Sequence, residues 1–218
     1  MLLQLEKFSI VLYTVFFPTS KPMGLIQNTL LPFLNDHSLT LRSLKFHALE
    51  KVDISSILAG LQHMPCLNSL NISHHFLSLG LMSLVSHQFL EAHQSQLQHL
   101  TFNFVAHSPS SDITNEFFNQ EWCRILFPEL QSLLFGLWFL RLTVLVFRED
   151  AAITYIQQHV LTVKSLQVSV LTFSYDQVAS ILTGLKGGEY RLTKLETLNL
   201  QIWCFSLALL SLLAENTP

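Results

Sequence analysis

The chain has 218 residues, enough for one sizeable hydrophobic core, so a single domain is the default expectation. Hydrophobic residues make up 50% and charged residues only 12%, about half the usual share, which indicates a partly covered surface or a piece of a longer protein. A net charge of −3 argues against nucleic-acid binding, and three widely spaced cysteines argue against a disulfide-rich scaffold.

Residues 1–20 contain a ten-residue apolar run that could be taken for a secretory signal. Glu6 dilutes the basic start that such a signal needs, and no small-residue cleavage site follows the run. A second apolar stretch, 130–147, barely reaches membrane-spanning length and carries Gln131 and Arg141. We therefore expect a cytoplasmic or nuclear protein and no membrane span, with a cleaved N-terminal signal as the open alternative.

A six-residue motif recurs along the chain: leucine, two free positions, leucine, one free position and an apolar residue. In chain order the copies are LEKFSI (5–10), LRSLKF (41–46), LNSLNI (67–72), LQHLTF (97–102), LQSLLF (130–135), LTVLVF (142–147), VSVLTF (168–173) and LETLNL (195–200). The fourth and sixth positions share one side of a strand, and the first position joins them where the chain bends in. Each copy therefore predicts a short strand that buries three side chains and needs other copies beside it.

The segments between the copies predict helices, which parallel strands need as crossovers. In residues 53–64, Asp53 is a candidate cap, and Ile54, Ile57, Leu58 and Leu61 form one apolar stripe. The other expected helices span residues 78–93, 112–127, 176–188 and 206–218. Strand and helix thus alternate with one period of 26 to 36 residues, apart from a 12-residue gap between Leu130 and Leu142.

This pattern resembles leucine-rich repeats of the long α/β type, as in ribonuclease-inhibitor-like horseshoes. FPELQSLLF and MPCLNSLNI, with Pro128 and Pro65 two residues before the first leucine, more narrowly resemble the repeats of fungal F-box proteins. The resemblance implies one α/β solenoid domain over residues 1–218, in seven or eight units. A parallel sheet would line its concave face, and helices would cover its convex face.

The resemblance also implies a protein-interaction module that binds another protein through the concave face. The narrower expectation is the substrate-recognition half of an F-box-type ubiquitin-ligase adaptor. Two alternatives stay open: a secreted or membrane-tethered repeat receptor, with Asn71 in a glycosylation sequon, and a non-functional fragment.

Several features depart from that family. The place three residues after the last strand leucine, where the family has Asn or Cys, holds Tyr13, Leu49, His75, Val105, Trp138 and Trp203. We therefore expect less regular coils. No F-box precedes the first copy, and the 12-residue gap is too short for a helical crossover, so either one of its two strands is not a repeat strand or sequence is missing. The chain stops at Pro218 in mid-repeat without a polar cap, which favours a fragment.

The sequence contains no recognisable site for chemistry. Ten histidines include the group His74, His75, His87, His93 and His99, but none has zinc-ligand spacing, and we expect ordinary surface histidines. No nucleophile signature is present, and residues 184–190 lack the phosphate-loop pattern. We therefore expect neither an enzyme nor a bound cofactor or metal ion.

The third, fifth and seventh positions of each copy should point to the concave face. They are small and polar in the copies that begin at Leu41, Leu67 and Leu97, and become apolar further along. The candidate partner-binding residues are Leu134, Val144, Val146, Arg148, Val170 and Thr172. The alternative is that the register is misassigned around the anomalous gap.

Overall fold

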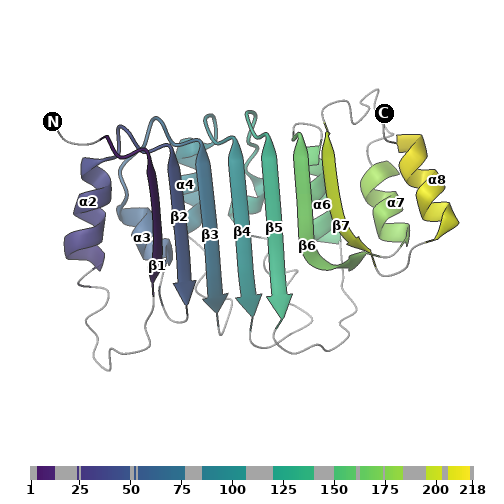
Figure 1. Cartoon of the computed structure of the whole chain (residues 1–218), viewed down its shortest axis with the longest axis horizontal. Helices are drawn as coiled ribbons and strands as arrows, with labels where there is room; N and C mark the ends of the chain where they lie inside the picture. The colour runs from purple at the N-terminus through teal and green to yellow at the C-terminus, as the bar shows by residue number, and fades with distance from the viewer. Residues whose placement is uncertain are drawn as a thin grey trace.

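The structure, a computed structural model, is an α/β fold in which the described strands form one parallel sheet (Figure 1). It describes residues 4–12, 24, 26–49, 52, 54–76, 85–106, 120–139, 150–160, 163–173, 175–183, 195–202 and 206–216. Within these ranges the seven strands lie in chain order, each beside the next. They are β1 (Lys7–Leu12), β2 (Ser43–Leu49), β3 (Ser69–Phe76), β4 (His99–Ala106), β5 (Ser132–Phe139), β6 (Ser165–Phe173) and β7 (Thr197–Ile202).

Helices connect the strands and lie on one side of the sheet. In order they are η1 (Ile26–Leu30), α2 (Leu31–Asp36), α3 (Ile54–Gly60), α4 (Val85–His93), η3 (Glu121–Arg124), α6 (Asp150–Val160), α7 (Tyr175–Thr183) and α8 (Leu207–Asn216). Figure 1 shows α3, α4 and α6 behind the sheet, with α2 at one end and α8 at the other. The arrangement is compatible with a solenoid.

One backbone pattern repeats at every step from β1 to β7. The carbonyl of the second motif position accepts hydrogen bonds from the N–H groups of the second and third positions of the next motif. For example, the Arg42 carbonyl accepts from Asn68 at 2.9 Å and from Ser69 at 3.0 Å. The carbonyls of Glu6, Asn68, Gln98, Gln131 and Lys164 do the same. All seven strands therefore share one register at their start.

This ladder corrects the register of the copy expected at 168–173, which forms the sixth strand. The Gln131 carbonyl accepts from Lys164 and Ser165, so the sixth motif is VKSLQV and begins at Val163, not Val168. Val163 is buried as a first position should be, and Val168 occupies the sixth position. The sequence obscured this copy because valine replaces leucine at its first position.

With the corrected register, no two consecutive described strands are separated by the 12-residue gap. From Leu130 to Val163 is 33 residues, and from Val163 to Leu195 is 32, within the range of the other spacings. Among the described residues, β5 pairs with β4 on one edge and with β6 on the other. The copy expected at 142–147 lies outside the described residues.

The core is larger than three side chains per strand. First, fourth and sixth positions are buried from the second to the sixth motif, as expected. The strands then continue past the motif, and the eighth position is buried as well, at Ala48, His74 and Phe104. At the outer strand β1 the equivalent Phe8 and Ile10 are only partly buried.

Four of the expected helices are confirmed in position: α3, α4 and α8 lie within the predicted ranges, and α7 begins one residue before its range. The helix expected over 112–127 is wrong in its last part, because η3 ends at Arg124 and Ile125 is extended. The reason is Pro128, which disfavours helical backbone at the preceding residue and cannot continue a helix. The helices α2 and α6 were not predicted.

Two kinds of turn deliver the chain into the strands. Pro65 and Pro128 each occupy the second place of a four-residue turn, closed by hydrogen bonds from Leu67 to Met64 and from Leu130 to Phe127. Proline fixes the backbone angle that this place requires. Elsewhere a wider turn does the same work, with the first-position N–H bonded to the carbonyl of His37, His93 or His159 four residues earlier.

The stretch 130–147, considered as a membrane span, contains strand β5. Within the ranges given above, no helix combines the length and the apolar character that crossing a membrane requires.

Candidate functional site: the exposed sheet face

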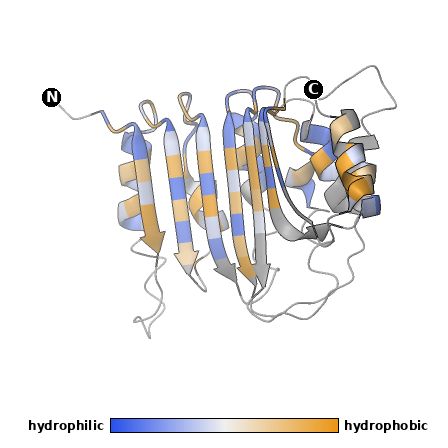
Figure 2. Cartoon of the chain, turned by 45° about the vertical axis from the view of Figure 1, so that its right-hand side comes forward, coloured by the Kyte–Doolittle hydropathy of each residue, from blue (hydrophilic) through white to orange (hydrophobic). Residues whose placement is uncertain are grey.

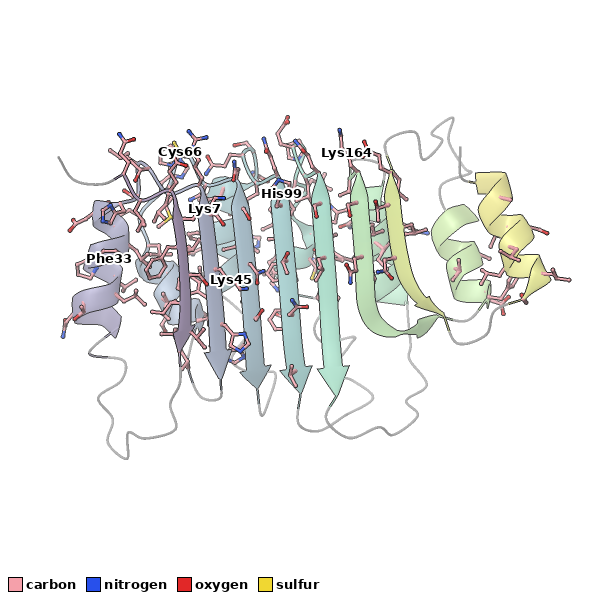
Figure 3. All side chains as sticks on the ribbon, viewed as in Figure 1. Lys7, Phe33, Lys45, Cys66, His99 and Lys164 are labelled. Carbon is pink, nitrogen blue, oxygen red and sulfur yellow. The ribbon has the colours of Figure 1, made fainter. Side chains whose placement is uncertain are left out.

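The side of the sheet away from the helices, here called the sheet face, is built from the third, fifth and seventh motif positions (Figure 3). Figure 2 shows hydrophilic and hydrophobic bands alternating along the strands, as a sheet with one buried side requires. The described side chains of the face are Lys7, Ser9, Val11, Ser43, Lys45, His47, Ser69, Asn71, Ser73, His99, Thr101, Asn103, Ser132, Leu134, Ser165, Gln167, Thr197 and Asn199.

The common register aligns these positions into rows across the sheet. The third-position row runs from Lys7 through Ser43, Ser69, His99, Ser132 and Ser165 to Thr197. The fifth-position row runs from Ser9 through Lys45, Asn71, Thr101, Leu134 and Gln167 to Asn199. Neighbouring members are about 4.8 Å apart, so the face is a regular grid of small polar groups.

The charge on this face has one sign. None of the 15 acidic residues of the chain lies in the seven strands, which contain two lysines, Lys7 and Lys45. Both ammonium groups are exposed, and neither makes an ion pair with a carboxylate of the described residues. Figure 3 places both on the sheet.

Charges just outside the face are paired instead. At the second motif position, Arg42 lies 3.9 Å from Glu6, and Lys164 lies 3.5 Å from Glu196. All four side chains are more than half exposed, so each pair contributes little to stability, on the order of 0.5 kcal/mol. Their effect is to neutralise the rim of the sheet while the lysines of the face remain uncompensated.

Leu134 is the one member of the predicted apolar patch whose side chain the structure describes. Leu134 does lie on the face, in β5, but Thr101 and Gln167 flank it on the neighbouring strands. Val170 and Thr172 lie in β6 where its register against β7 shifts, between Val168 and Phe173, and are not the positions that the ladder aligns with the face. The aligned face positions of β6 are Ser165 and Gln167.

Val144, Val146 and Arg148, the remaining predicted members, lie outside the described residues. The alternative of a misassigned register therefore accounts for the apparent change from polar to apolar in β6. What the face offers a ligand is hydrogen-bonding groups and positive charge, with Val11 and Leu134 as separate apolar contacts.

The expectation of ordinary surface histidines is wrong for His74, His93 and His159, which are all buried. The Nε2 atom of His74 lies 2.9 Å from the Val52 carbonyl oxygen. The physical reason is that an imidazole can satisfy backbone groups inside the core while its ring packs as an apolar body. Sequence spacing alone contains no sign of such partners.

His93 joins two consecutive units. Its Nε2 accepts a hydrogen bond from the Met64 N–H at 3.0 Å, so Nδ1 must carry the proton and donate to the Phe89 carbonyl at 2.7 Å. Burial lowers the pKa of His93 below its ordinary value, against the opposing effect of the Phe89 hydrogen bond; nearby His63 lowers it further. The ring is therefore neutral in its bridging role.

Two amide side chains hold the same loop. Gln96 donates to the Met64 carbonyl at 2.6 Å. From the unit before, Asn35 donates to the Gly60 carbonyl at 3.1 Å and accepts from the Gln62 N–H at 2.9 Å. These bonds satisfy backbone groups between α3 and β3 that no helix or strand satisfies, and they tie three successive units together.

The remaining reactive groups do not form a catalytic arrangement in the described part. Cys66 is exposed, while Cys123 is buried, and burial raises the pKa of the Cys123 thiol well above its usual value. Among the residues with a described position, no three His, Cys, Asp or Glu side chains come together where they could hold a metal ion.

Comparison with known proteins yields no match among family models, curated proteins or solved structures.

Proposed function

We propose that this chain is a leucine-rich repeat protein with a horseshoe solenoid, and that it binds another protein on its sheet face. One observation supports this most strongly: a face of mostly polar side chains, in one register at the start of seven strands, on the side opposite the hydrophobic core. Such positions can be shaped for a ligand without loss of stability. The helices cover the opposite side, which leaves the sheet as the free surface (Figure 1).

The size of the face suits a protein partner. Seven strands at about 4.8 Å spacing span about 30 Å, and six residues at about 3.3 Å rise span about 20 Å. The resulting area of roughly 600 Å² approaches the roughly 800 Å² per partner of a standard protein interface. A small molecule would usually require a concave, mostly apolar pocket instead.

The narrower proposal is the substrate-recognition region of an F-box-type ubiquitin-ligase adaptor. It is supported by the Pro-x-Leu pattern at Pro65 and Pro128, although each proline also has a structural role as a turn former. In that case the bound protein is a degradation target. Its steady-state level in cells should rise when the chain is deleted, and an unchanged level would leave only the binding role.

If the protein were secreted, Asn71 would be a glycosylation site instead of a residue that contacts a partner. This residue is in the fifth-position row, half-buried between Lys45 and Thr101. A glycan there would cover the middle of the sheet face. A shift in mass on glycosidase treatment would therefore contradict the proposed binding surface as well as the intracellular location.

A pair of matched substitutions tests the binding surface. Gln167→Arg places a bulky cation on the face, whereas Gln88→Arg makes the same change on an exposed position of α4, in the helical layer. We expect cross-linking mass spectrometry in cells to detect partner proteins with the wild type and Gln88→Arg, and to lose them with Gln167→Arg. Partners that survive Gln167→Arg but disappear with Gln88→Arg would contradict the proposal.

A further inference from the structure

We infer that the partner presents an extended acidic segment to the first half of the sheet face, over β1 to β4. This inference rests on the proposed function and specifies the chemistry of its ligand. The opposing half, on β5 to β7, offers the uncharged Ser132, Leu134, Ser165, Gln167 and Asn199 and would contact a neutral part of the same partner.

The charge distribution carries the inference. The whole chain has a net charge of −3, yet its seven strands contain two lysines and no carboxylate. Cations beside the face, Arg42 and Lys164, form ion pairs with carboxylates, whereas the exposed Lys7 and Lys45 form none with a described carboxylate. A surface of one sign on a protein of the other sign attracts a partner of complementary charge and disfavours basic ones.

The spacing of the two lysines fits an extended chain. Lys7 pairs with Ser43, so Lys45 lies on the adjacent strand and two residues further along. Their Cα atoms are therefore about 8 Å apart diagonally. Side chains two residues apart on an extended peptide are about 7 Å apart, so carboxylates at alternate positions can reach both ammonium groups.

Polar neighbours complete the site. Asn71 is paired with Lys45 in the fifth-position row, and Thr101 follows it. The Asn71 amide and the Thr101 hydroxyl can donate to the carboxylate oxygens or peptide carbonyls of the segment. The Ser73 hydroxyl bonds to the Asn71 carbonyl oxygen at 3.4 Å, which leaves the Asn71 amide hydrogens for a ligand.

A nucleic acid is the less suitable anion. Single strands are bound by many basic residues together with aromatic rings on which bases stack. The described face has two lysines, and its described side chains include no Phe, Tyr or Trp. Binding an acidic protein segment requires fewer positive charges and more hydrogen-bonding groups than binding a nucleic acid. The described face has this composition.

Fluorescence anisotropy with a labelled peptide of alternating glutamate and serine tests the inference on the full chain. The variant Lys7→Gln/Lys45→Gln removes the face charges, and Lys164→Gln removes a matched cation from the rim. At low salt we expect the double variant to weaken binding roughly fivefold to tenfold and Lys164→Gln to change it by less than about twofold. Added salt should weaken wild-type binding.

Three outcomes would overturn the inference: no binding of the acidic peptide, equal affinity of the wild type and the double variant, or tighter binding of a labelled single-stranded oligonucleotide. The Gln167→Arg experiment separates this failure from that of the proposed function. If cellular partners depend on Gln167 but not on the two lysines, the face binds protein without the acidic preference. Both lysines are exposed, so unchanged thermal unfolding verifies that the variants fold.

Discussion

At the scale of single residues, we expect His93 to contribute more to the free energy of unfolding than the residues of the sheet face. His93→Ala removes both of its hydrogen bonds and leaves the Met64 N–H buried without an acceptor. We expect the free energy of unfolding to fall by about 2–4 kcal/mol. Gln88→Ala, at an exposed position of the same helix, should change it by less than about 0.5 kcal/mol. Urea denaturation measures both, and an equal effect would show that the bridge is not stabilising.

His159 makes stability depend on pH. It packs between Phe127 and Tyr155, with ring centroids 5.8 and 5.0 Å away, and burial lowers its pKa to about 4 from an ordinary 6.5. Between these two pKa values the unfolded chain binds a proton at His159 and the folded chain does not. The free energy of unfolding is therefore highest above pH 6.5 and declines as the pH falls towards about 4. The loss corresponds to about 3 kcal/mol.

The variant His159→Phe tests this dependence while keeping a ring of similar size. Unfolding by urea, repeated from neutral pH down to about pH 4, should show a shallower loss of stability for the variant than for the wild type. The lowered pKa of His93 acts in the same direction and remains in both proteins. Parallel pH profiles would contradict the assignment.

At the scale of elements, the leucine motif predicts strands well where all three apolar positions are strong. It failed at β6, where Val163 and Val168 frame the motif and β-branched residues continue to Thr172, so the sequence alone allows several registers. Backbone pairing to β5 decides between them. The helix α6 lies between the copies expected at 142–147 and 168–173, and no helix was predicted there.

A pair of adjacent alanine substitutions tests the register of β6. Leu166 is fully buried, and its neighbour Gln167 is on the sheet face. Leu166→Ala should lower the free energy of unfolding by about 3 kcal/mol, and Gln167→Ala should lower it by clearly less. Equivalent losses, measured by chemical denaturation, or a larger loss for Gln167→Ala, would mean that the strand faces the other way.

At the scale of the whole molecule, the sequence predicted an α/β fold of parallel strands and crossover helices, and this is what the described residues form. It could not predict the side-chain bridges of Asn35, His93 and Gln96, since their partners are backbone groups of neighbouring units. Nor did it predict that the polar face continues through β6. The misassigned register placed Val170 and Thr172 on the face, where the structure aligns Ser165 and Gln167.

The central claim is that all seven strands start in one register, from Glu6 to Glu196, and that this register creates a single face. Cross-linking with a short bifunctional thiol reagent tests this claim between β5 and β6, where the register expected from the sequence was wrong. The native cysteines are first replaced by alanine. Ser132 and Ser165 are direct partners on β5 and β6, so Ser132→Cys/Ser165→Cys should cross-link efficiently. Efficient cross-linking of Ser132→Cys/Val144→Cys instead, with little product for the first pair, would contradict the account.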